Sequence, residues 1–145
     1  MKRFLMMLVM SLAIMTTAFA QADKVCGTYK VLRNGVNSKV KVFKHGNGFR
    51  AQVIWVDNLK KEDGSIRLDE KNPDKSKRNV QADKIVLIDN VTYDAKSNTW
   101  KGGQIYDPTS GKTFKVELYF KDAKTLTVKG MLGPFFERMY WTKIQ

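Results

Sequence analysis

The chain has 145 residues and a mass of 16.6 kDa, with 26 Lys and Arg against 14 Asp and Glu, one His and one Cys. This length fits one compact domain, and a composition of 43% hydrophobic and 28% charged residues excludes wholesale disorder and fibrous architectures. The single Cys excludes an intramolecular disulfide and any metal site built from several thiolates.

The N-terminal residues have the parts of a secretory signal peptide. Lys2 and Arg3 form a basic start, an apolar run follows from Phe4 to Met15, and Ala-Phe-Ala at 18–20 matches the small-x-small cleavage pattern. We predict residues 1–20 as a signal peptide, with export to the periplasm or the extracellular space and no transmembrane segment after cleavage. In such a compartment the lone Cys26 is either buried or free to form an intermolecular bond, and we expect burial.

From Val25 onward, apolar residues recur with a period of two, which is typical of half-buried strands. In the stretch 112–121, for example, Phe114, Val116, Leu118 and Phe120 share one face. Short turn sequences such as Asn34-Gly35 separate these runs. The pattern predicts strands at 26–32, 39–44, 49–56, 85–92, 99–106, 112–121, 125–130 and 137–144.

One long polar stretch, 57–84, interrupts the rhythm of hairpins. A loop of this length inside a compact domain is either functional, such as a lid over a barrel mouth, or a surface excursion. The second interpretation predicts a small hairpin around Asp63-Gly64 and a helical turn after Pro73.

Strands joined in sequence by hairpins predict an all-β fold, an eight-stranded antiparallel up-and-down barrel spanning residues 21–145 as a single domain, because closure removes free strand edges. A barrel of this size is either filled by side chains or holds one small ligand. Gly130 and other small residues favour a cavity, and the bulky aromatic residues favour a filled core. If a cavity exists, we expect its lining to include Trp55, Trp100, Tyr106, Phe114 and Trp141.

Several motifs resemble a known family. They are Asp69-Glu70-Lys71-Asn72-Pro73-Asp74 with Arg78, the run Trp100 to Pro108 with Gly111 to Phe114, and Arg138 with Trp141-Thr142. Together they resemble the exported bacterial proteins of the domain of unknown function 2147 family, from about Gly27 to the C-terminus. The resemblance implies a calycin-like fold, similar to lipocalins, and implies no particular activity.

The resemblance also suggests how the barrel closes. Lipocalin-like barrels tend to open with Gly-x-Trp, whose ring packs against an Arg of the last strand. This chain has Gly27-Thr28-Tyr29 instead, and we expect Arg138 to be the cation over the Tyr29 ring, a weaker contact than one over Trp.

No catalytic constellation is recognisable in the sequence. The only His, His45, lies in a Gly-rich turn, no Ser has a Gly-x-Ser-x-Gly context, and the acidic residues of the 57–84 loop alternate with Lys and lack the spacing of a calcium loop. We predict no enzyme, no metal site and no cofactor. Asn72, Asp74, Arg78 and Asp107 either serve turns alone or converge with Tyr106 into a polar rim at one barrel mouth.

Positive charge remains after signal cleavage. From residue 21 onward the net charge is +10, because only Lys2 and Arg3 are lost, and the basic residues are 19 Lys and five Arg without a long basic block. Scattered Lys favours a hydrated surface over nucleic acid, and allows attraction to an anionic envelope surface. The sequence therefore predicts non-catalytic binding of a small apolar or amphipathic ligand. The alternative is a cell-envelope interaction or maintenance protein with a filled barrel that acts through the 57–84 loop.

Overall fold

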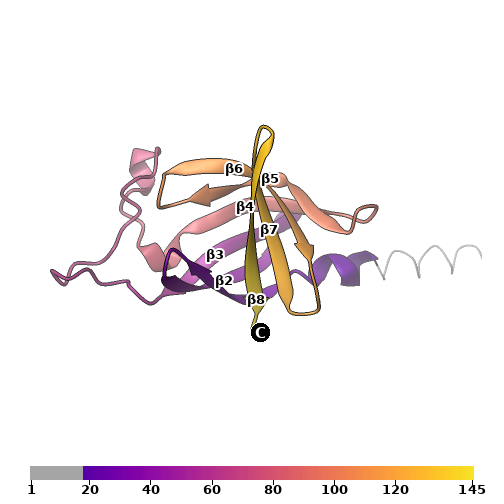
Figure 1. The fold of residues 1–145 in the computed structure, drawn as a ribbon, viewed down its shortest axis with the longest axis horizontal. Coiled ribbons are helices and arrows are strands. Elements are labelled where there is room, and N and C mark those ends of the chain that lie inside the picture. Colours follow the sequence, from indigo (N-terminus) through magenta and orange to yellow (C-terminus); the bar gives the residue numbers. More distant parts are fainter. Residues whose placement is uncertain (1–17) are drawn as a thin grey trace, which may run out of the picture.

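The computed structural model describes residues 18–145, so almost all of the predicted signal peptide, residues 1–20, lies outside the described residues. Eight antiparallel strands form one closed barrel in sequence order, which confirms the predicted architecture (Figure 1). In chain order the strands are β1 (Gly27–Arg33), β2 (Val36–His45), β3 (Gly48–Val56), β4 (Val86–Asp94), β5 (Thr99–Asp107), β6 (Lys112–Phe120), β7 (Thr125–Leu132) and β8 (Phe135–Lys143).

The period-two pattern places one apolar face of each strand inside the barrel. On β6, Val116 and Leu118 are buried, whereas Lys115, which precedes Val116 and points to the other face, is exposed. Tight turns keep consecutive strands adjacent. Asn34 and Gly35 both have positive φ, at 51° and 78°, as the two-residue hairpin between β1 and β2 requires.

A β-bulge on β3 reverses the alternation near the end of that strand. Val53 pairs with Val40 on β2, and Trp55 pairs with the next residue, Lys39, so Ile54 is an extra residue. An extra residue moves everything after it to the opposite face of the sheet. Val56 therefore faces inward, and Trp55 is 44% exposed on the outside, where the Lys39 ammonium lies 5.4 Å from its ring centroid.

One end of the barrel is closed by the residues that precede β1. Trp100 is fully buried there, packs between Tyr93 and Phe120, and donates a hydrogen bond from Nε1 to the Ala22 carbonyl at 2.9 Å. Val25 is also fully buried, and its carbonyl accepts the Tyr29 hydroxyl at 2.8 Å. Val25 thus belongs to the barrel core and Ala22 packs against it, although both closely follow the predicted cleavage site.

The barrel is closed less completely toward the other end. β1 and β8 pair at only two positions, Tyr29 with Lys143 and Lys30 with Thr142, both near the closed end. Beyond them the ladder stops, although β7 and β8 continue to pair as far as Leu132 with Phe135. The resulting gap between β1 and β8, which we call the seam, runs up to the open end, where the tip of the β7–β8 hairpin projects from the barrel (Figure 1).

Between β3 and β4 lies the long connection, which contains two short 3-10 helices, η1 (Lys75–Lys77) and η2 (Ala82–Lys84). It also has isolated bridges between Lys60 and Ile66 and between Leu68 and Gln81. Within residues 18–145, no helix is long and apolar enough to cross a bilayer.

Candidate functional site

The open end of the barrel contains a cavity of about 590 Å³. Its wall is mainly apolar, and it reaches the surface beside the exposed side chains of Leu132 and Phe135. The wall is formed by residues of all eight strands, among them Val31, Val53, Ile105, Phe114, Gly130 and Trp141. The interior is therefore filled at the closed end and hollow at the open end. Of the two possibilities left by the sequence, a filled barrel and a barrel with a cavity, each describes one end.

Two buried hydrogen-bond donors, on residues that line the cavity, have no partner within the described residues. They are Nε1 of Trp141, whose side chain is 1% exposed, and Nε of Arg33, and both atoms are buried. Buried N–H groups without partners are rare in proteins, because each costs about 1–3 kcal/mol in lost hydration. Trp141 on β8 and Arg33 on β1 lie on the two sides of the seam, so both residues belong to the same wall of the cavity.

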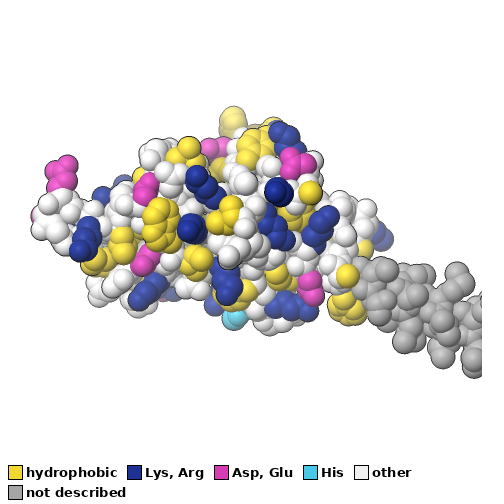
Figure 2. Space-filling model, turned by 90° about the horizontal axis from the view of Figure 1, so that it is seen from below, with side chains coloured by type: hydrophobic (Ala, Val, Ile, Leu, Met, Phe, Trp, Pro, Cys, Tyr) yellow, Lys and Arg dark blue, Asp and Glu magenta, His cyan; other side chains and the backbone are white. Residues whose placement is uncertain are grey.

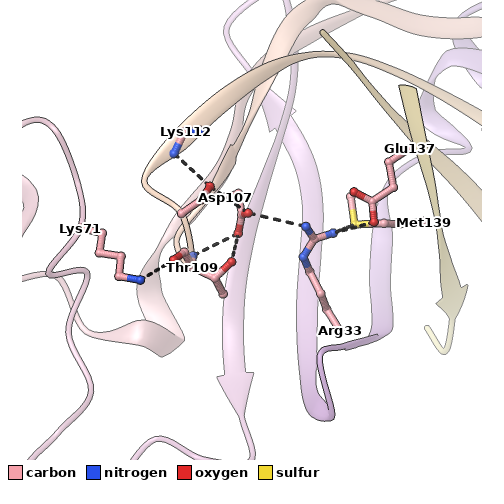
Figure 3. A network of polar contacts seen from close by, with 8 residues as sticks. Arg33, Lys71, Asp107, Thr109, Lys112, Glu137 and Met139 are labelled. Atoms are coloured by element: carbon pink, nitrogen blue, oxygen red, sulfur yellow. Dashed lines mark hydrogen bonds and ion pairs between the residues drawn. The ribbon is translucent and has the colours of Figure 1, made fainter. Parts of the chain in front are cut away.

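Arg33 is the centre of a polar network at the cavity mouth (Figure 3). Its guanidinium lies 3.6 Å from a carboxylate oxygen of Asp107 on β5 and 3.7 Å from one of Glu137 on β8, and it contacts the Met139 sulfur. These distances are longer than those of good charge-assisted hydrogen bonds. The Arg33 side chain, 33% exposed, thus sits between two carboxylates without strong hydrogen bonds to either.

Asp107 is held in its charged form by the turn that follows β5. Burial of the carboxylate favours a higher pKa, but hydrogen bonds from the Thr109 hydroxyl and amide and from the Ser110 hydroxyl, together with the Arg33 charge, outweigh it and hold the pKa below the ordinary value. The sequence Asp-Pro-Thr-Ser-Gly therefore forms the turn and also fixes a negative charge at the mouth.

The 57–84 loop is fastened to the barrel beside the cavity. The Asp69 carboxylate is buried, and accepts hydrogen bonds from the Tyr106 hydroxyl at 2.7 Å and the Asn72 amide at 2.8 Å. Burial and the hydrogen bond to Asp69 raise the pKa of Tyr106. Lys71 adds a second attachment, donating from Nζ to the Thr109 carbonyl at 2.7 Å. The loop is therefore anchored to the β5–β6 end of the barrel, and it supplies Asn58 and Arg67 to the cavity wall.

Three of the five predicted lining residues border the cavity, namely Tyr106, Phe114 and Trp141. The prediction for Trp55 is wrong, because the β3 bulge turns this side chain to the outside of the barrel. The prediction for Trp100 is also wrong in its location. Its ring is inside the barrel, but it fills the closed end and does not border the cavity.

The predicted polar rim is only partly assembled. Asp107 borders the cavity, whereas Asn72, Asp74 and Arg78 do not. Asn72 instead orders the loop, because its carbonyl accepts from Arg78 Nε at 2.7 Å and its side chain accepts from the Asp74 amide at 2.9 Å. Asp74 is exposed and caps η1 through Ser76. These three residues shape the loop that carries Asp69, and local turn chemistry accounts for their positions.

The expected pairing of Tyr29 with Arg138 is wrong as well. Arg138 faces outward, where its guanidinium lies 4.5 Å from the Phe136 ring centroid and Nε donates to the Tyr119 hydroxyl at 3.1 Å. The cation over Tyr29 is Lys143, at 6.0 Å from the ring centroid, and Lys143 also donates to the Lys24 carbonyl at 2.7 Å. Arg138 and Lys143 are five positions apart on β8, an odd number, so they lie on opposite faces of the strand.

Gly27 contributes to closure through the absence of a side chain. A Cβ at this position would lie 2.3 Å from the Gln145 carbonyl oxygen, and its φ is +150°. The C-terminal residues can therefore pair with the start of β1, as the hydrogen bond from the Thr28 amide to the Gln145 carbonyl shows.

The sequence also contains an indication of the polar network around Arg33 at the cavity mouth. Arg33 on β1 lies an even number of positions from the buried Tyr29 and Val31, so alternation places it on the same inward face. Glu137 on β8 lies on the same face as Met139 and Trp141 for the same reason. Charged residues at inward positions of a strand are unusual unless they are paired or functional. The alternation of inward and outward residues along each strand thus indicates Arg33 and Glu137 as cavity residues.

Cys26 is unpaired and half-buried, and burial, together with the nearby Asp23 carboxylate, raises the pKa of its thiol. A raised pKa disfavours the reactive thiolate. Within residues 18–145, no three His, Cys, Asp or Glu side chains are grouped so as to hold a metal ion.

Comparison with known proteins agrees with this geometry. The sequence model of the family described as "Uncharacterized protein conserved in bacteria (DUF2147)" matches residues 27–143. No curated protein matches the chain. A similar solved structure is that of protein HP1028 from the human pathogen Helicobacter pylori, which is described as belonging to the lipocalin family. It is 24% identical, with a TM-score of 0.67 over 83% of each chain. The lipocalin-like barrel and the match over nearly all of residues 21–145 together show that the chain belongs to the DUF2147 family.

Proposed function

We propose that this protein binds a small, largely apolar or amphipathic molecule in the open end of its barrel and performs no covalent chemistry on it. The observation that carries the proposal is the cavity of about 590 Å³, which lies within the range of roughly 300–1,000 Å³ of small-molecule sites. The description of the Helicobacter pylori protein as a lipocalin supports the fold on which the proposal rests.

The two unpartnered donors favour an amphipathic ligand over a pure hydrocarbon. An oxygen acceptor on the ligand, such as a carbonyl or carboxylate, would satisfy the Trp141 Nε1–H or the Arg33 Nε–H once the side chains that cover these buried atoms move aside. The apolar remainder would then fill the space between Ile105, Phe114 and Val53. Such a site has mostly hydrophobic walls with a few polar groups that orient the ligand.

The cavity wall favours binding over catalysis. The described residues that line it include no His, Cys or Lys, so the usual pairs of nucleophile and base are absent from this wall. The alternative function, a filled barrel that acts through the 57–84 loop, is not favoured by a hollow open end.

Binding is tested with two fluorescent probes and native mass spectrometry. The probes are N-phenyl-1-naphthylamine, which lacks a strong acceptor, and 11-(dansylamino)undecanoic acid, which carries a carboxylate. We expect both to bind, and Trp141→Phe to weaken only the carboxylate probe, by about five-fold, the equivalent of one hydrogen bond of about 1 kcal/mol. Trp55→Phe is the matched control, since this ring lies outside the barrel.

The outcome that overturns the proposal is equally definite. If neither probe binds, and protein purified from its own host carries no small molecule in native mass spectra, the cavity is not a ligand site. If both probes bind but Trp141→Phe and Trp55→Phe behave alike, the assignment of the acceptor to Trp141 is wrong.

A further inference from the structure

Positive charge is divided unequally between the two halves of the barrel. Lys and Arg side chains lie among apolar ones over the face seen in Figure 2, but the strands share them unevenly. β7, β8, β1 and β2, the four strands around the seam, carry eight basic residues and one acidic residue, Glu137, whereas β3 to β6 carry four of each. The half-barrel with the seam therefore holds a net +7, and the opposite half is neutral.

This half-barrel also contains like charges placed directly opposite each other. Lys30 on β1 pairs in register with Lys39 on β2, and Lys129 on β7 pairs with Arg138 on β8. Like charges at opposed positions of antiparallel strands are destabilising. Within residues 18–145, none of these four side chains has a carboxylate within ion-pair distance. Folding alone therefore gives no reason for this arrangement.

Exposed aromatic rings lie beside these cations. Lys129 Nζ and the Arg138 guanidinium lie 4.7 and 4.5 Å from the Phe136 ring centroid, and Phe136 is 54% exposed. Tyr140 on β8 is 53% exposed, and Trp55, which lies on the adjoining strand β3 next to Lys39 of β2, is 44% exposed. Aromatic rings with a polar edge, alternating with Lys and Arg, are typical of surfaces that lie at the boundary between lipid headgroups and acyl chains.

We propose that the outer face of β7, β8, β1 and β2, which we call the basic face, docks on an anionic lipid bilayer. Phosphate groups of the lipids neutralise Lys30, Lys39, Lys129 and Arg138. Phe136 and Tyr140, together with Trp55 at the β3 border of this face, enter the headgroup region. The occupant is a bilayer and not a soluble polyanion, because the aromatic rings beside the cations gain nothing from a hydrated polymer. Docking in this orientation turns the seam between β1 and β8 toward the lipid.

The test measures binding of the full-length gene product, as its host processes it, to vesicles of phosphatidylglycerol and phosphatidylcholine in equal parts. The basic-face variant carries Lys30→Gln, Lys39→Gln, Lys129→Gln and Arg138→Gln. Its matched control carries Lys84→Gln, Lys96→Gln, Lys112→Gln and Lys115→Gln, four exposed lysines outside the basic face. Both variants have the same net charge and the same N-terminus, so neither total charge nor residues 1–20 distinguish them.

We expect the basic-face variant to lose at least about 100-fold in vesicle affinity, since each basic residue near an anionic surface contributes about five-fold. The control variant is expected to stay within about five-fold of the unmodified protein, and binding to pure phosphatidylcholine vesicles to be weak. Because glutamine removes two like-charge contacts, the basic-face variant should unfold no earlier than the unmodified protein, which separates lost docking from lost folding.

A third variant, Trp55→Ser with Tyr140→Ser, separates a bilayer from a soluble anionic polymer. It is expected to weaken binding to the anionic vesicles by about ten-fold and to leave binding to soluble polyphosphate unchanged. Equal losses of vesicle affinity in the basic-face variant and its matched control would overturn the assignment. So would unchanged vesicle binding in the variant that lacks the Trp55 and Tyr140 rings. The probe titrations described above contain no lipid, so failure of the ligand proposal and failure of this one are read separately.

Discussion

Replacing Gly130 with Leu tests whether the open end of the barrel is hollow. Gly130 lies on β7 and borders the cavity, and a Cβ built there meets its nearest neighbours, Phe114 and Ile105, at ordinary contact distances of 3.8 and 3.9 Å. Its φ is not in the left-handed region, so a side chain causes no backbone strain. A leucine at this position should therefore extend into the cavity.

The expected effects on stability and binding have opposite signs. Partial burial of a leucine side chain contributes about 1 kcal/mol, and replacing glycine within a strand adds about 0.5–1 kcal/mol. The free energy of unfolding should therefore rise by about 1.5–2 kcal/mol, and Tm by about 6–8 °C for a domain of this size. Ligand binding should weaken by about ten- to a hundred-fold, because the ligand now overpacks against the new side chain at a cost of about 1–3 kcal/mol.

Gly130→Ala is the matched control for this substitution. This substitution restricts the backbone of the unfolded chain as leucine does, but adds almost no side-chain volume. It should therefore raise Tm by a few degrees and leave the affinity for the probe nearly unchanged. Differential scanning calorimetry and titration with N-phenyl-1-naphthylamine give the two quantities. A fall in Tm for Gly130→Leu with unchanged probe binding would refute the reasoning, because it would mean that the interior at β7 is already full.

Three further predictions concern the closed end, the loop and the mouth. Lys143→Ala should lower the free energy of unfolding by about 1–2 kcal/mol in urea denaturation, because it removes a charged donor to the Lys24 carbonyl and a cation over the Tyr29 ring. Arg138→Ala should lower the same free energy by less than about 0.5 kcal/mol. If Arg138→Ala had the larger effect, Arg138 and not Lys143 would be the residue that closes the barrel. Asp69→Ala should lower the free energy of unfolding by about 2–4 kcal/mol and expose the 57–84 loop to proteases, since it leaves the Tyr106 hydroxyl and the Asn72 amide without their partner. An unchanged rate of proteolytic cleavage would show that other contacts hold the loop. Asp107 has a lowered pKa in the folded protein. Its contribution to folding stability is therefore fully present above the unfolded pKa of about 3.9, and is lost as pH falls through the lower folded pKa. The stability difference between the unmodified protein and Asp107→Asn should therefore shrink between pH 7 and pH 3, and a constant difference would contradict the assigned role.

The sequence by itself determined the architecture of this protein. The period-two runs and the turn residues between them, such as Asn34-Gly35, specify strands that must pair with their neighbours, because each strand has one face to bury and consecutive strands are joined by only a few residues. Phe114, Val116 and Leu118 face inward as the alternation predicts. Export and the signal peptide remain predictions of the sequence.

The tertiary structure alone decided which aromatic rings surround the cavity and how charge is distributed. A bulge adds one residue to β3 and moves Trp55 to the outside, and no property of the residues 49–56 taken alone marks that insertion, since it depends on the register with β2. Trp100 fills the closed end because the segment before β1 folds over it. Lysines that are scattered along the chain come together on one half-barrel because β7 and β8 pair beside β1 and β2. Each of these outcomes depends on contacts between residues far apart in sequence, and a local pattern does not contain them.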